Sequence, residues 1–129
     1  INAMKHRLAA LDARIVNQWL SDDDISEALS ANDILVAPYR EASQSGVVAA
    51  ALGAELPVIA TPVGGLPEQV GGGVGVVAES PSGPAIARAI RPLATDRAIV
   101  AAMAERIRAT APARSMRVFL PQVVDAACS

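Results

Sequence analysis

The sequence predicts an α/β fold in three layers, with about four mostly parallel strands and helices toward the C-terminus. Short apolar or β-branched runs alternate with stretches of helical periodicity along the 129 residues. A hydrophobic content of 52% with 19% charged residues is typical of one folded globular domain. Aromatic residues make up only 2%, so Ala, Val, Ile and Leu must fill the core.

The first half of the chain contains two of the predicted strands. Ala13–Trp19 is short and β-branched, and Asp33–Pro38 is a continuous apolar run, typical of parallel strands buried on both faces. Between them, Ser21 is predicted to cap a helix whose first turn holds the aspartates 22–24, where the helix dipole favours negative charge. This interpretation is favoured over a metal-binding acidic cluster. A further helix is predicted over Ser45–Gly53.

The second half contains two more strands and the C-terminal helices. The strands are Pro57–Pro62 and Val74–Ala78, joined by a glycine turn with up to one helical turn. Thr95 is predicted to cap one helix, and Ser115 to open the last, which Pro121 should kink or restart. The helices between the last strand and Ser115 show apolar side chains three or four positions apart, namely Ile86, Ile90, Leu93, Ile99, Met103 and Ile107.

Charge and composition exclude several functions. The net charge is −2 with both signs interleaved, so no basic surface for nucleic acid is predicted. Cys128 is the only cysteine, and His6 is the only histidine and is expected to be exposed, which argues against a disulfide, a Cys- or His-based metal site and a Ser/His/Asp triad. We expect residues 1–3 to be an expression remnant and residues 4–129 to form a single soluble, cytoplasmic domain.

Two loops follow strands at their carboxyl ends, where ligands bind in parallel sheets. In "PYREASQSGVVAAALG", Gln44, Ser45 and Gly46 form the first turn of a helix, whose free N–H groups suit a phosphate. The alternative is that Ser43 or Ser45 merely caps the helix. Glu41 is a carboxylate at the same carboxyl end of a strand. It is either a ligand contact or a solvated loop residue.

The second loop is "TPVGGLPE", residues 61–68, whose paired glycines allow either a bare backbone facing a cleft or a simple turn. A third glycine-rich stretch, "VGGGVG" at residues 70–75, fits no phosphate-binding pattern and is predicted to be a flexible turn.

The order of these loops resembles a known family. The stretch "ANDILVAPYREASQSGVVAAALGAELPVIATPVGGLPEQV" is similar to the donor-binding half of family 4 glycosyltransferases, the "glycosyl transferases group 1" enzymes of GT-B fold. The resemblance covers roughly residues 13–127. It is carried by a strand, an acidic loop, a helix and a glycine turn, whose matching positions are Asp33, Pro38, Glu41, Pro57 to Thr61, Gly64, Gly65, Pro67 and Glu68.

The resemblance implies a truncated Rossmann-like, nucleotide-sugar-binding domain of a retaining enzyme that transfers a sugar from a nucleotide-diphospho sugar to an acceptor. No metal and no cofactor beyond the donor substrate are implied. The resemblance places donor contacts on both loops, namely on Glu41, Ser43, Gln44, Ser45, Gly46, Val47, Gly64 and Gly65. Catalytic residues are not assigned.

This chain departs from the family in two ways. The second glutamate, which holds the nucleotide ribose, would fall at Ala49 or Ala50, and neither side chain makes that contact. The chain is also much shorter than a two-domain GT-B enzyme. The acceptor-binding domain and the first strands of the donor domain are then missing, and the exposed apolar surface predicts self-association.

Three interpretations stay open. The full-length protein is expected to be a transferase, cytoplasmic or peripheral to the inner membrane, while this chain alone is expected to be inactive. A fragment of a GT-B sugar-nucleotide epimerase is the second hypothesis. A stand-alone, non-catalytic GT-B-like binding module is the third.

Overall fold

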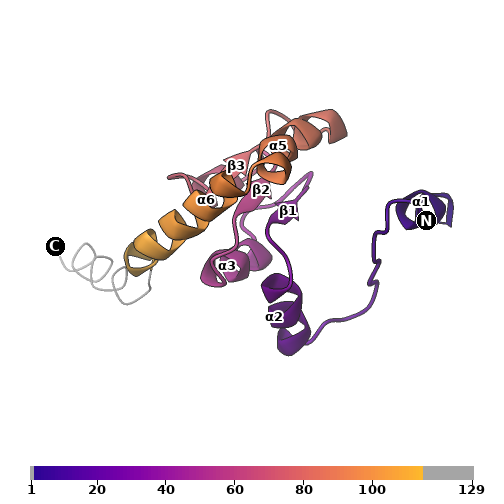
Figure 1. Cartoon of the computed structure of the whole chain (residues 1–129), viewed down its shortest axis with the longest axis horizontal. Coiled ribbons are helices and arrows are strands. Elements are labelled where there is room, and N and C mark those ends of the chain that lie inside the picture. The colour runs from indigo at the N-terminus through magenta and orange to yellow at the C-terminus, as the bar shows by residue number, and fades with distance from the viewer. Residues whose placement is uncertain (1, 115–129) are drawn as a thin grey trace.

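A sheet of three parallel strands forms the centre of the computed structural model, which describes residues 2–114 (Figure 1). The strands are β1 (Leu35–Ala37), β2 (Val58–Ala60) and β3 (Gly75–Val77), in the spatial order β1-β2-β3. The register places Leu35 beside Val58 and Val58 beside Gly75. The predicted parallel α/β sheet is therefore confirmed.

The middle strand β2 is buried along its whole length. Val58 and Ala60 belong to the main core cluster together with residues of α3 (Gly46–Gly53), and α3 packs against β1 and β2. Ile59 points to the opposite face, because side chains alternate along a strand. The helix α5 (Gly83–Thr95) also packs against β2, and its buried Ala85 and Leu93 lie outside the main cluster. Helices thus cover both faces of the sheet, as a three-layer fold requires.

The remaining helices are short or lie at the margins of the sheet. They are α1 (Asn2–Ala9), α2 (Asp22–Ser30), α4 (Leu66–Gln69), α6 (Arg97–Thr110) and a 3₁₀ turn at Pro112–Arg114. Helix α1 was not predicted. No helix among residues 2–114 combines the length and apolar character that a membrane span needs.

Two predicted helix starts are confirmed and one is wrong. Ser21 forms a capping box with Asp24: its hydroxyl accepts from the Asp24 N–H at 3.2 Å, and the Asp24 carboxylate accepts from the Ser21 N–H at 2.8 Å. Ser45 caps α3. Thr95 does not cap α6, because it is the last residue of α5 and its hydroxyl donates back to the Arg91 carbonyl. Asp96 is the cap, accepting from the Ala98 N–H at 2.9 Å.

The predicted strand at residues 13–19 is also wrong, so the sheet has three strands and not four. This stretch forms an arm (residues 10–20) that stands away from the sheet and carries α1 (Figure 1). Leu11, Ile15, Val16 and Trp19 are exposed on the arm. β-Branched residues favour a strand only where a neighbouring strand and a packed face receive them, and the arm has neither.

The predicted helix from Ser115, with its kink or restart at Pro121, lies outside the described residues. So does Cys128.

Candidate functional site

The two predicted ligand loops meet at the carboxyl ends of β1 and β2. The Gly65 N–H donates to the Ser43 carbonyl at 2.7 Å, which joins the loop after β2 to the loop after β1. The Thr61 hydroxyl, completely buried, donates to the Tyr39 carbonyl at 2.6 Å. Residues 39–45 are therefore held in place by the loop after the neighbouring strand.

Ser45 is the best-anchored residue of this site and is only 6% exposed. Its hydroxyl accepts from the Val48 N–H at 3.2 Å and lies 3.2 Å from the Tyr39 hydroxyl. Its carbonyl accepts from the Ala49 N–H at 3.1 Å, the first bond of helix α3.

The side chain of Gln69 completes this network from helix α4. Its Oε1 accepts from the Ser45 N–H at 3.0 Å, and its Nε2 donates to the Ser45 carbonyl at 3.2 Å. A single amide group therefore satisfies both backbone groups of a residue 24 positions earlier in the chain.

These bonds determine which N–H groups remain for a ligand. The N–H groups of Ser45 and Val48 are occupied, whereas no acceptor within residues 2–114 reaches those of Gly46 and Val47. A Cβ at Gly46 would meet nothing within 4 Å, and Val47 is 42% exposed. The first turn of α3 thus presents two adjacent free donors to open space, at the positive end of the helix dipole.

The paired glycines have a structural role at this site. Gly64 has a φ of +52°, and a Cβ there would overlap the carbonyl oxygen of Ala42. A Cβ at Gly65 would lie 2.6 Å from the carbonyl oxygen of Ser43. Both glycines are required for the close packing of the two loops, whether or not a ligand also approaches them.

Glu41, Ser43 and Gln44 lie on the exposed side of the same loop. Glu41 has no ion-pair partner among the described residues. All eight residues that were predicted to contact the donor substrate therefore lie on two touching segments, Glu41–Val47 and Gly64–Gly65.

Three residues of this site were not among those predicted to contact the donor substrate: Tyr39, Thr61 and Gln69. Tyr39 is the only tyrosine of the chain and lies inside the polar loop, which is a signal that sequence analysis could have used. Gln69 had no such signal, because its role depends on a contact between loops.

A pocket of about 720 Å³ lies beside the site, between α3 and α4. Gln44, Gly65 and Gln69 line it, together with Glu55 and Glu68. The Arg108 guanidinium donates to both Glu55 oxygens, and this hydrogen bonding holds the pKa of the Glu55 carboxyl below its ordinary value. Within the described chain, no group of three or more His, Cys, Asp and Glu side chains is placed to hold a metal ion.

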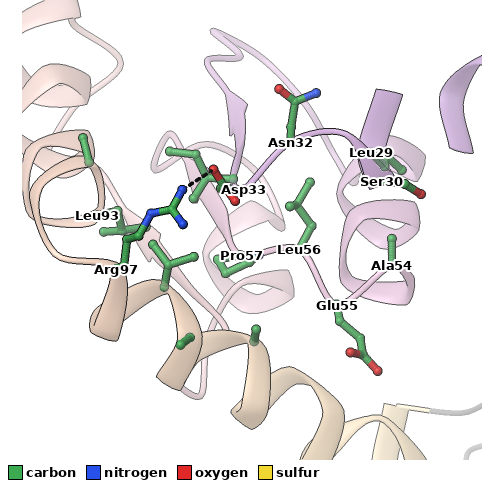
Figure 2. Close-up of a pocket in the computed structure, with 15 residues that line it drawn as sticks. Leu29, Ser30, Asn32, Asp33, Ala54, Glu55, Leu56, Pro57, Leu93 and Arg97 are labelled. Carbon is green, nitrogen blue, oxygen red and sulfur yellow. Dashed lines mark ion pairs between the residues drawn. The ribbon is translucent and has the colours of Figure 1, made fainter. Parts of the chain in front are cut away.

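A second pocket, of about 630 Å³, lies at the opposite edge of the sheet (Figure 2). It is lined by Ile34 and Pro57, which immediately precede β1 and β2, and by residues of α5 and α6. Its Asp33–Arg97 ion pair is long, at 3.9 Å, and both side chains are more than 80% exposed. Ligands of parallel sheets bind at the carboxyl ends of the strands, so the loops after β1 and β2, rather than this pocket, form the candidate site.

The fold and site define an open α/β domain whose polar loops gather at the carboxyl ends of parallel strands, the class that includes the nucleotide-binding folds. The family model for glycosyl transferases group 1 matches residues 2–96, which is more than half of the chain. The chain therefore belongs to the glycosyl transferases group 1 family, and this membership supports a function in glycosyl transfer. No curated protein matches the chain.

Proposed function

We propose that this domain is the donor-binding half of a retaining GT-B glycosyltransferase of family 4 and that it binds a nucleotide-diphospho sugar. The observation that carries the proposal is the pair of free N–H groups on Gly46 and Val47. Both residues lie within the stretch that the family model matches. A helix start with free amides and no side chain in the way suits a diphosphate.

The chemistry of sugar transfer needs such a site. When the bond between the sugar and the diphosphate breaks, its electron pair leaves on the diphosphate oxygen and negative charge develops there. Donors that are already oriented stabilise this charge without reorganisation at the moment of reaction. Gly46 and Val47 would provide two of these donors, and parts of the enzyme outside the 129 residues would provide the acceptor site.

Glu41 is proposed to contact the sugar. Its carboxylate is exposed at the same edge and is not used in an ion pair within residues 2–114, so it is free to accept hydrogen bonds from sugar hydroxyls. Ala49 and Ala50 offer no carboxylate for the ribose, so we expect the diphosphate and sugar to supply most of the affinity.

Calorimetry on this chain tests the donor class. UDP-glucose and GDP-mannose would be titrated, with free glucose and free mannose as controls. We expect binding of at least one nucleotide sugar, weakened by added salt, and no binding of either free sugar. Absence of binding for all nucleotide sugars would overturn the proposal and favour the non-catalytic module.

We also propose that a second copy of the chain covers the exposed arm. The outer edge of β1 has no strand partner among the described residues, and an extended β-branched segment is what pairs with such an edge. Residues 13–19 of the arm are such a segment, and their own apolar side chains are exposed. Exchange of arms between two copies would pair the outer edge of each β1 strand and bury the apolar side chains of each arm.

A further inference from the structure

We infer that Gln69 is a positioning residue that orients the free N–H groups of Gly46 and Val47 by clamping the backbone of Ser45. The inference rests on the proposed function for its consequence in ligand binding. The clamp itself is a property of the unliganded domain.

The geometry of the clamp leaves Ser45 little freedom. The amide of Gln69 contacts the N–H and the carbonyl of Ser45 at 3.0 and 3.2 Å, which fixes the residue at two points. The Ser45 carbonyl also receives the first helical bond of α3, and the Ser45 hydroxyl caps the Val48 N–H. Rotation of Ser45 would therefore change the direction of the whole first turn, including the amides of Gly46 and Val47.

The clamp also determines which backbone N–H groups remain free to bind a ligand. Gln69 occupies the Ser45 N–H, which would otherwise be a third donor at the helix start. A ligand therefore meets two amides whose directions are set through Ser45 by Gln69, a residue of α4.

The chemistry of the contact requires a side chain that donates and accepts at once. Glutamine does both, and a protonated carboxyl does both, whereas a carboxylate only accepts. In the variant Gln69→Glu the protonated carboxyl can form both bonds. The ionised form would place a negative oxygen against the Ser45 carbonyl.

The introduced carboxyl is expected to titrate above the ordinary glutamate value of about 4.3, because the neutral form is the hydrogen-bonded one. Glu68, which lines the adjacent pocket, acts in the same direction, whereas the charge of Glu55 in that pocket is offset by its ion pair with Arg108. The clamp should therefore be present at low pH and be lost as the pH rises through this raised pKa.

The experiment compares wild type, Gln69→Glu, Gln69→Leu and Tyr39→Phe in two measurements between pH 4.5 and 8, a range chosen to span the expected titration. The first measurement is the protection of the Ser45 amide from hydrogen exchange, with the amide chemical shifts of Gly46 and Val47. The second is the affinity for UDP-glucose and GDP-mannose, each divided by the wild-type value at the same pH.

We expect Gln69→Leu to lose Ser45 protection and about fivefold or more in affinity at every pH. Gln69→Glu should match wild type at low pH and Gln69→Leu at high pH, in both measurements. Tyr39→Phe removes only the contact with the Ser45 hydroxyl and leaves both Gln69 bonds, so it should lose less Ser45 protection than Gln69→Leu at every pH.

The outcomes separate the two proposals. Wild-type affinity in Gln69→Leu, with Ser45 protection lost, would overturn the positioning role while leaving the proposed function intact. Failure of wild type to bind any nucleotide sugar would overturn the proposed function, and the exchange and shift measurements would still decide whether Gln69 sets the amides. Unchanged protection and shifts in both Gln69 variants would overturn the clamp.

Discussion

Gly64 lies so close to Ala42 that a Cβ at Gly64 would overlap the Ala42 carbonyl oxygen. The turn after β2 therefore depends on glycine at this position. The same turn donates the Gly65 N–H to Ser43, so it supports the loop that carries the candidate donor contacts.

The variant Gly64→Ala should destabilise the domain severely. It combines a left-handed φ of +52° with a backbone overlap, and we expect a loss of about 3 kcal/mol or more in the free energy of unfolding. Gly72→Ala is the matched control, because Gly72 also has a positive φ, of +73°, but open space around its Cβ position. It should cost only about 1 kcal/mol. Urea unfolding measures both, and equal losses would contradict the overlap.

Removal of one proposed donor should weaken binding of nucleotide sugars. Gly46→Pro deletes the N–H at the first position of α3, where proline is well tolerated, and the space around Gly46 is open. We expect about a tenfold loss of affinity by calorimetry, the value of one charge-assisted hydrogen bond.

Gly46→Ala retains the N–H and is the control for this loss. An equal loss in both variants would mean that close approach to the backbone, rather than donation by the amide, makes Gly46 important.

Acid should weaken the bond between Glu55 and Arg108. The pKa of Glu55 is lowered, first by its hydrogen bond with Arg108, so the stabilisation is present above the ordinary value of 4.5 and is lost as the pH falls through the lowered folded-state pKa. Replacing the cation in Arg108→Gln should reduce the slope of unfolding free energy against pH below 4.5. The change should be small and sensitive to salt, because the two side chains are 57% and 44% exposed.

Arg88→Gln is the control for this pH dependence. It breaks the exposed pair with Glu79, a glutamate for which the structure supports no comparable two-point contact. A slope in Arg108→Gln identical to that of wild type would contradict the role of this ion pair.

Trp19 reports directly on the proposed self-association, because it is the only tryptophan and is 95% exposed. A monomer should show long-wavelength emission and ready quenching by iodide. Raising the protein concentration should shift the Trp19 emission to shorter wavelength. Over the same concentration range, light scattering should show the mass double from monomer to dimer. Ile15→Ser keeps the reporter and should move the transition to higher concentration. Unchanged emission with a constant monomer mass would contradict the arm exchange.

The helices and strands that the sequence predicted correctly depend on neighbours in the chain. Ser21 and Ser45 cap helices through bonds to residues three positions later, and the run around Val58–Ala60 is apolar because it is buried on both faces. Such short-range chemistry can be inferred from spacing alone. The predicted strand at residues 13–19 failed because a strand also needs a partner, which local sequence does not supply.

The sequence by itself determined the parallel α/β class, the helix start at Ser45 and the polar loops at the carboxyl ends of the strands, since each follows from local periodicity and capping. Only the tertiary structure decided that Gln69 clamps Ser45, that Gly64 must accommodate Ala42, and that Gly46 and Val47 keep the free amides. The first two of these features depend on contacts between residues more than twenty positions apart, and such contacts exist only after the loops of neighbouring strands have been brought together.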